Sequence, residues 1–114
     1  MSQDLKSRTR QFALDIIEVV DVLSSAISKR VIGNQLMKSG TSVGANYRAA
    51  CRARSDKEYI AKINIVLEEV DEANFWLDII KVKSWHNVDK LIQESDELTA
   101  IFVTILKKMN NKNK

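Results

Sequence analysis

Basic side chains gather in the middle of this sequence, at a spacing that suits contact with phosphate groups. Between Lys29 and Lys62 there are eight basic and two acidic side chains, a net charge of +6 within a chain whose total is +3. Arg48 and Arg52 are four residues apart, so on a helix they share one face. Cationic side chains on one face attract the phosphates of RNA or DNA. The candidate nucleic-acid-binding residues are Arg48, Arg52, Arg54, Lys57 and Lys62.

The next stretch of the sequence is acidic, which gives the same arginines a second interpretation. From Ile63 to Asp78 there are five acidic side chains and no basic one. Carboxylates of Glu68, Glu69 and Glu72 are suitable partners for the arginines, within one subunit or between two. In that case the charges hold proteins together and need no nucleic acid, so the sequence leaves both interpretations open.

Groups suited to catalysis or metal binding are sparse. His86 is the single histidine and Cys51 the single cysteine, whereas di-iron bundles need two Glu-x-x-His pairs and structural zinc sites need several Cys or His ligands. Gly40 and Gly44 have neither the spacing nor the preceding strand of a phosphate-binding loop. We therefore expect no enzyme, no cofactor and no metal. An enzyme that uses the carboxylates is a minor alternative, and it would need a deep pocket around Glu69.

Helical periodicity runs through the whole sequence and supplies the elements that carry these residues. There is no proline and there are three glycines, which disfavours strands joined by tight turns. Apolar residues recur every three or four positions, as on one face of a helix. The predicted helices are about Asp4–Ser28, Arg30–Arg54, Ser55–Lys83, and a fourth that follows a turn at Ser84–Asn87.

Several residues mark where these helices begin or weaken. Ser55 and Glu58 form a capping-box pattern, and Asn87 is the expected N-cap of the fourth helix. The poor helix formers at residues 40–42 allow a kink or break in the second helix. The sequence thus predicts an all-α fold, an antiparallel up-down-up-down four-helix bundle forming a single domain over residues 1–114, with a frayed tail from about residue 110.

More apolar side chains are present than one bundle core can hold. Ile65, Trp76 and Ile79 form a second apolar strip on the third helix. Scattered exposed apolar residues are normal, but large aromatic residues are favoured at subunit interfaces. We therefore expect a homo-oligomer with these three residues in its interface.

Two asparagines fall close to the predicted core stripes. Buried amides must be hydrogen-bonded and can fix helix register. Asn46 and Asn74 are therefore candidate structural polar residues. The alternative is that both lie at the edge of the stripe and contact water.

The sequence also indicates a location. One cysteine cannot form an internal disulfide, and the N-terminus has no apolar signal core. No apolar run approaches the length of about 20 residues that a membrane span needs. We expect a cytoplasmic protein with no membrane association.

Residues 41–80, TSVGANYRAACRARSDKEYIAKINIVLEEVDEANFWLDII, resemble the core of the bacterial four helix bundle protein family. That family includes proteins encoded by intervening sequences within large-subunit ribosomal RNA genes, and the accessory proteins of diversity-generating retroelements are related to it. The resemblance implies a ring of antiparallel bundles, commonly a pentamer. In the retroelement relatives it implies a basic surface that binds nucleic acid and a reverse transcriptase. Many relatives carry Glu-Gly where this chain has Ala49 and Ala50, which places it in a different branch.

These observations predict a non-enzymatic homo-oligomer, pentameric by resemblance, whose basic surface contacts RNA or DNA. A reverse transcriptase is a partner by resemblance alone. The alternative is a protein-interaction scaffold with no nucleic-acid role, in which the arginines form ion pairs between subunits.

Overall fold

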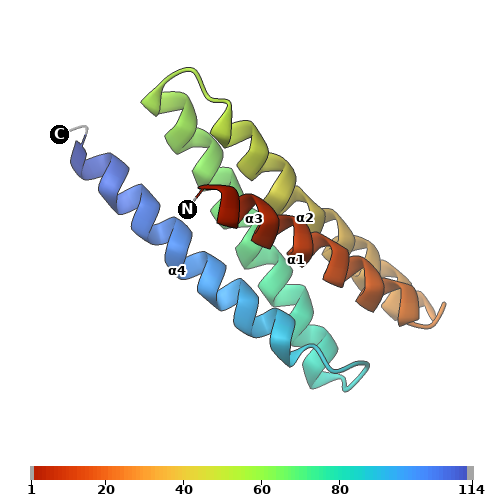
Figure 1. The fold of residues 1–114 in the computed structure, drawn as a ribbon. Helices are drawn as coiled ribbons and strands as arrows, with labels where there is room; N and C mark the ends of the chain where they lie inside the picture. The colour runs from red at the N-terminus through yellow and green to blue at the C-terminus, as the bar shows by residue number, and fades with distance from the viewer. Residues whose placement is uncertain (1, 113–114) are drawn as a thin grey trace.

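Four helices make up the part of the chain that the structure describes, and each runs antiparallel to the helix before it (Figure 1). The computed structural model describes the backbone of residues 2–112 and the side chains of residues 4–112. The helices are α1 (Ser2–Val22), α2 (Ile27–Cys51), α3 (Asp56–Val82) and α4 (Asp89–Lys112). The described chain contains no strand and measures 49 × 21 × 21 Å. This confirms the predicted all-α, up-down-up-down four-helix bundle.

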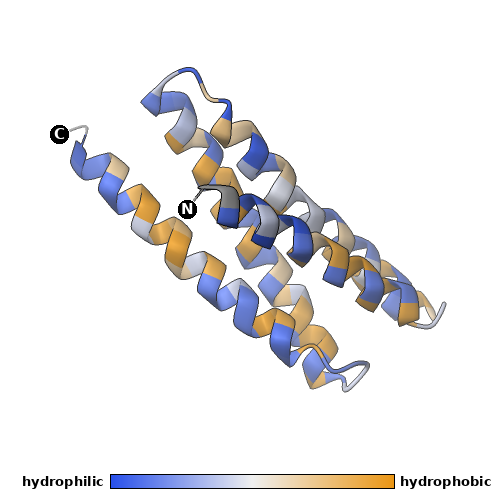
Figure 2. Cartoon of the chain, viewed as in Figure 1, coloured by the Kyte–Doolittle hydropathy of each residue, from blue (hydrophilic) through white to orange (hydrophobic). Residues whose placement is uncertain are grey.

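The core lies along the bundle axis and receives side chains from all four helices. Figure 2 shows apolar and polar residues alternating along each helix, as amphipathic packing requires. The rings of Tyr47 on α2 and Phe102 on α4 lie 5.6 Å apart between centroids, which joins diagonal helices across the core. The largest fully buried side chains are Tyr47, Phe12, Phe102, Ile16, Leu36, Ile63, Leu77, Ile80, Leu98, Val43, Val66 and Val70.

The first helix is shorter than the sequence predicted. It ends at Val22, not near Ser28, and α2 begins at Ile27. The hydroxyl of Ser24 accepts a long hydrogen bond of 3.4 Å from the backbone N–H of Ala26. Serine side chains of this kind offer the backbone an alternative to helical hydrogen bonds. Apolar periodicity continues across this turn, which is why it did not reveal the end of the helix.

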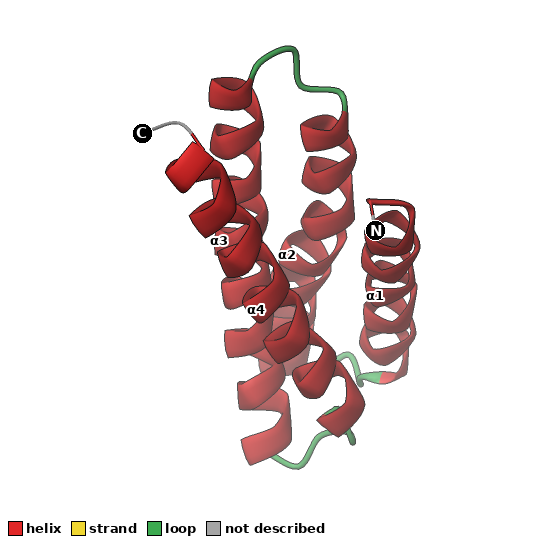
Figure 3. Ribbon diagram, turned by 60° about the vertical axis from the view of Figure 1, so that its left-hand side comes forward, coloured by secondary structure: helices red, strands yellow, loops and turns green. Residues whose placement is uncertain are grey.

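The other two connections, residues 52–55 and 83–88, are short loops between antiparallel helices (Figure 3). The hydroxyl of Ser55 accepts a hydrogen bond of 3.1 Å from the backbone N–H of Glu58, which confirms the N-cap of α3. The side-chain oxygen of Asn87 accepts one of 3.1 Å from the backbone N–H of Asp89, in the first turn of α4. Helix α4 continues through Lys112, and residues 113–114 of the predicted frayed tail lie outside the described residues.

Helix α2 is continuous through residues 40–42, where a break was allowed. The hydroxyls of Thr41 and Ser42 donate to backbone carbonyls four residues earlier, at 2.7 and 2.6 Å. These bonds satisfy the two hydroxyls within the helix, so the hydroxyls do not draw the backbone into a turn at this point.

Helices α1 and α2 are in close contact at two glycines of α2. A Cβ atom on Gly40 would overlap the buried side chain of Ile16. A Cβ atom on Gly44 would lie 3.3 Å from the backbone oxygen of Thr9. The missing side chains therefore let α1 lie directly on the α2 backbone, as helix interfaces with small residues allow.

One charged side chain of α1, Arg8, links this helix to α4. The guanidinium of Arg8 donates to both carboxylate oxygens of Glu94, at 3.0 and 2.7 Å, and to Glu97 at 3.2 Å. Arg8 and Glu94 are only partly exposed, and the two-pronged geometry makes this pair stronger than an ordinary surface ion pair. Hydrogen bonding to Glu94 raises the pKa of Arg8.

The glycine contact predicts different outcomes for two similar substitutions. Gly→Ala in a helix interior gains about 1 kcal/mol of helix propensity at either position. Gly33 has room for a methyl group, whose nearest neighbour would be Val20 at 3.4 Å, whereas at Gly40 the buried Ile16 must move. Overpacking of this kind costs about 1–3 kcal/mol. We expect Gly40→Ala to be less stable than Gly33→Ala by that amount in urea unfolding, and equal stability of the two variants would contradict the close contact.

Candidate nucleic-acid interface

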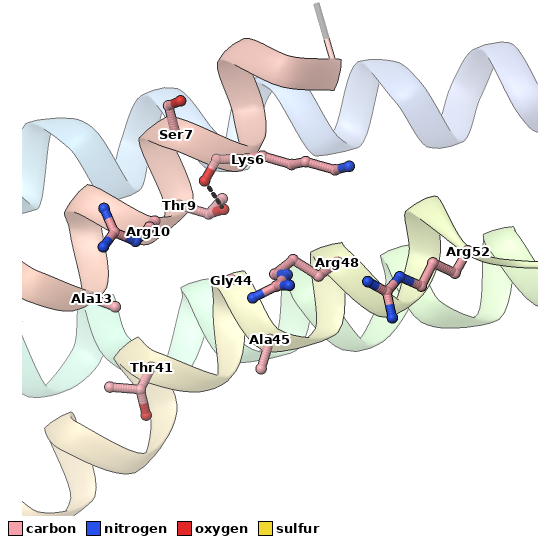
Figure 4. Close-up of a pocket in the computed structure, with 10 residues that line it drawn as sticks. All are labelled: Lys6, Ser7, Thr9, Arg10, Ala13, Thr41, Gly44, Ala45, Arg48 and Arg52. Carbon is pink, nitrogen blue, oxygen red and sulfur yellow. Dashed lines mark hydrogen bonds between the residues drawn. The ribbon is translucent and has the colours of Figure 1, made fainter.

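A groove between α1 and α2 brings together basic side chains that are far apart in the sequence. Lys6 and Arg10 of α1 line one side, and Arg48 and Arg52 of α2 line the other (Figure 4). The hollow has a volume of about 530 Å³. Its remaining lining is small or hydroxyl-bearing: Ser7, Thr9, Ala13, Thr41, Gly44 and Ala45.

The two helices position these cations in matched pairs. Each pair has a spacing of four residues, so the two side chains of a pair lie on one face, about 6 Å apart along the helix axis. The close approach of α1 at Gly44 brings the two pairs to opposite walls of one groove. Side chains no larger than Thr41 lie between them and leave the groove open.

The electrostatics of the groove are uniformly positive. All four cationic side chains are exposed, and no aspartate or glutamate lines the hollow. Within the described part of the chain, none of the four forms an ion pair. Four uncompensated cations around a hollow of this size attract a polyanion.

The structure separates the five predicted nucleic-acid-binding residues. Arg48 and Arg52 line the groove, but Arg54, Lys57 and Lys62 do not. Arg54 is exposed in the α2–α3 connection and lines a different hollow at that end of the bundle, Lys57 is exposed in the first turn of α3, and Lys62 is half-buried farther along it.

Sequence reasoning missed the two cations that α1 contributes. Lys6 and Arg10 lie outside the +6 segment, so a local charge count did not include them. Their spacing of four residues matches that of Arg48 and Arg52, and consecutive helices of a bundle are neighbours. Those two facts together could have indicated that Lys6 and Arg10 lie beside Arg48 and Arg52.

Ion pairs between the arginines and the acidic segment are not made within one subunit. Arg48 and Arg52 face the α1 side of α2, away from α3, and none of the ion pairs among the described residues joins them to Glu68, Glu69 or Glu72. The intrasubunit form of that interpretation is therefore wrong. The acids form a separate negative band on α3, in which burial raises the pKa of Glu69 and the carboxylates of Glu72 and Glu68 raise it further.

The single cysteine and the single histidine lie in different parts of the bundle. Cys51 is half-buried beside Tyr47 and Tyr59, and burial raises the pKa of both tyrosines. His86 is exposed in the α3–α4 connection. Over the described residues, no group of three or more His, Cys, Asp or Glu side chains is arranged to hold a metal ion.

The two candidate structural asparagines have different roles. The amide of Asn74 donates to the buried hydroxyl of Ser95 at 2.8 Å and to Asp96 at 3.2 Å, which links α3 to α4. The amide of Asn46 donates to the backbone oxygen of Ser42 at 2.9 Å, within its own helix. Both side chains are half-buried, but only the contact of Asn74 fixes one helix against another.

The predicted interface strip on α3 is partly occupied by the core. Trp76 packs against the core cluster and donates to Glu72 at 3.2 Å, and Ile79 is half-buried. Ile65 is 36% exposed. The adjacent Phe75 is 55% exposed and meets Trp76 edge to face at 4.9 Å, so it is the more accessible aromatic residue.

Asn74 should contribute measurably to stability. Asn74→Ala removes the amide from the buried hydroxyl of Ser95, and we expect the free energy of unfolding to fall by about 1–2 kcal/mol. Asn64→Ala is the matched control, because Asn64 is exposed on the same helix and donates only within it, to Ile60. An equal effect of the two substitutions in chemical denaturation would refute the register role.

The raised pKa of Glu69 predicts a specific pH dependence. A carboxyl whose pKa is higher in the folded state loses folded-state stability on ionisation, and that loss is absent below its unfolded-state pKa of about 4.3. We expect Glu69→Gln to increase the free energy of unfolding at neutral pH and to have no effect at about pH 3. Asp78→Asn, which removes one exposed negative charge from the same helix, is the control. A stabilisation that does not change with pH would contradict this origin.

Comparison with known proteins is informative about family and fold. The family model described as "23S rRNA-intervening sequence protein" matches residues 2–109. A similar solved structure is the crystal structure of a protein with unknown function from the S23 ribosomal protein family of Bacteroides thetaiotaomicron VPI-5482. The two sequences are 28% identical, and the TM-score of the two structures is 0.85. The match covers 93% of this chain and 97% of the other. Among curated proteins none matches this sequence. Over the described residues, no helix has the length and apolar character needed to cross a bilayer.

Proposed function

The chain belongs to the 23S rRNA-intervening sequence protein family, and from this premise we propose that it is a non-enzymatic, homo-oligomeric helical bundle that binds nucleic acid through the groove between α1 and α2. The ligand is the phosphate backbone of RNA or DNA. The observation that carries the proposal is the set of four unpaired cations, Lys6, Arg10, Arg48 and Arg52, on the two walls of one hollow.

The composition of the groove favours backbone contact over recognition of bases. No aromatic side chain lines it, so it offers no platform on which bases could stack. Lysine and arginine at matched spacings neutralise phosphates, and such contacts position a nucleic acid without reading its sequence. Binding should therefore depend strongly on salt and weakly on sequence.

The alternative is a protein scaffold in which the same arginines form ion pairs between subunits. A second, smaller hollow favours it, because Arg48 and Arg52 there flank the small side chains of Ala45 and Ala49. A side chain from another subunit can be accommodated beside the arginines at that place. The two functions differ in what binds the arginines, and a binding measurement separates them.

The salt dependence of binding tests the groove directly. Each phosphate contact contributes a slope of about −0.9 to the plot of log affinity against log salt concentration for a duplex. We expect Arg48→Gln/Arg52→Gln to weaken binding to a short labelled RNA duplex and to reduce the magnitude of that slope by about 2, as measured by fluorescence anisotropy. Lys107→Gln/Lys108→Gln, which removes two exposed charges from α4, should leave affinity and slope close to those of the wild type.

The outcomes distinguish the two functions. A loss of salt-dependent affinity in the groove variant alone supports nucleic-acid binding, and a DNA duplex of the same sequence shows whether the sugar matters. No binding by the wild type, together with an oligomer that dissociates at high salt, would favour the scaffold instead. Equal losses in both variants would mean that overall charge, and not the groove, attracts the nucleic acid.

A further inference from the structure

Two outward helix faces carry most of the exposed apolar surface. Seven large apolar side chains are exposed among the described residues, and five of them lie on the outer faces of α2 and α3. These five are Ile27, Val31, Ile65, Phe75 and Val82. Exposed apolar residues concentrated on defined faces indicate interaction surfaces, whereas scattered ones do not.

The outer face of α3 has the spacing of a helix–helix seam. We call it the α3 stripe, and its members alternate by three and four residues: Ile65, Glu68, Glu72, Phe75, Ile79 and Val82. Phe75 and Val82 are 55% and 73% exposed. The stripe is apolar at both ends and acidic in the middle, and neither Glu68 nor Glu72 forms an ion pair within the described residues.

The outer face of α2 has the same spacing and the opposite charge. We call it the α2 stripe, and its members are Ile27, Val31, Asn34, Lys38, Thr41 and Ala45. Ile27 and Val31 are 73% and 51% exposed and form an apolar end. Lys38 is exposed in the middle and forms no ion pair with any described residue.

We propose that the α3 stripe of one copy packs antiparallel against the α2 stripe of a second copy. In this register Val82 meets Ile27, Ile79 meets Val31, Glu72 meets Lys38, and Ile65 meets the small side chain of Ala45. Ile27 and Val82, the most exposed of the large apolar residues that the structure describes, bury each other, and a central ion pair fixes the alignment.

Other pairings of these faces leave charges or apolar groups without partners. Two α3 stripes facing each other would gather four carboxylates in one interface without a counter-charge. Two α2 stripes facing each other would leave Lys38 without a counter-charge, because this stripe contains no acidic residue. A parallel α2–α3 pairing also brings Lys38 to Glu72, but it sets Val82 against Arg48. Of these arrangements, the antiparallel α2–α3 pairing covers the shared apolar end at Ile27 and Val82 and places opposite charges at the centre, with Phe75 beside Asn34.

The proposed contact has a defined symmetry. It joins two different faces, so each copy has one face free for the next, and such contacts build closed rings or open filaments. Val31 lies twenty residues before the end of α2, and Ile79 lies twenty-three residues after the start of α3. Because the two helices are antiparallel and joined by a short loop, these residues have similar positions along the bundle axis. Neighbouring copies are then related mainly by rotation, with little displacement along the axis, which favours a ring.

This inference rests on the self-association in the proposed function, and not on nucleic-acid binding. Lys6 and Arg10 lie on α1, outside both stripes, whereas Thr41 and Ala45 of the α2 stripe also line the groove. Lys38 and Glu72 do not line it, so substitutions there test the contact between copies without removing any of the four groove cations.

The primary test of the proposed register exchanges the charges of Lys38 and Glu72, which form its central ion pair. Lys38→Glu or Glu72→Lys alone places like charges opposite each other, and we expect each to weaken self-association by about tenfold or more. Lys38→Glu/Glu72→Lys restores opposite charges and should recover association to within about threefold of the wild type. The readout is mass by light scattering over a concentration series. Lys107→Glu, on the exposed face of α4, controls for an equal change of charge, and circular dichroism verifies folding.

Disulfide trapping distinguishes the direction of the helices. In a Cys51→Ser background, oxidation of a mixture of Val31→Cys and Ile79→Cys proteins should give a covalent dimer. A mixture of Val31→Cys and Ile65→Cys proteins, which a parallel pairing would bring together, should not. Mixing two singly substituted proteins excludes a bond within one chain.

The possible failures are distinct. A wild-type mass of 13.0 kDa at all concentrations would overturn self-association, and with it the proposed oligomeric function. Two results would overturn only the register and leave self-association standing. One is a Lys38→Glu/Glu72→Lys variant that associates no better than the single variants. The other is a covalent dimer from the mixture of Val31→Cys and Ile65→Cys proteins.

Discussion

The close contact between α1 and α2 at Gly40 and Gly44 is the constraint on which the functional surface depends. Without side chains at these positions, α1 rests against the α2 backbone, and Ile16 fills the space that a methyl group on Gly40 would take. This approach sets the width of the groove above it. Larger residues at Gly44 would push Thr9 away and separate Lys6 and Arg10 from Arg48 and Arg52. The same glycines therefore determine both the packing of α1 and the density of positive charge.

The groove cations and the acidic band of α3 lie on separate faces of the bundle. The positive groove lies between α1 and α2, and the negative band lies along α3. Arg8, which also lies on α1, is neutralised by Glu94 and Glu97 of α4 and so does not add to the groove. Asn74 and Ser95 fix α4 against α3 with a buried polar contact. Polar contacts thus set helix register on one side of the molecule, while unpaired charges on other faces remain available for partners.

The fold was predictable because its signals are local. Apolar spacing located all four helices, and Ser55 marked the start of α3 correctly. The early end of α1 was missed, because the turn at residues 23–26 interrupts the helix without interrupting the apolar pattern. The site was less predictable, because it depends on which helices are neighbours and which way each face turns.

Arg48 and Arg52 show the difference between a local and a tertiary signal. Their spacing identified a shared face, and the structure places both at one groove. Arg54, Lys57 and Lys62 belonged to the same charged segment but follow the chain around the α2–α3 connection onto other surfaces. Likewise, Trp76 and Phe75 are adjacent in sequence, and only packing determines that Phe75 is the more exposed of the two. Neither the placement of the cations nor the exposure of the aromatic residues can be obtained by counting charges along the sequence.

The central claim is that nucleic acid binds between α1 and α2, and nuclear magnetic resonance of the arginine side chains during titration with an RNA duplex tests it most directly. The account predicts that the Nε–Hε signals of Arg10, Arg48 and Arg52 shift. The signal of Arg8, which is held by Glu94, should stay in place and serves as an internal control. Saturable binding that shifts Arg54 or Arg30 while the three groove arginines remain unchanged would contradict the account.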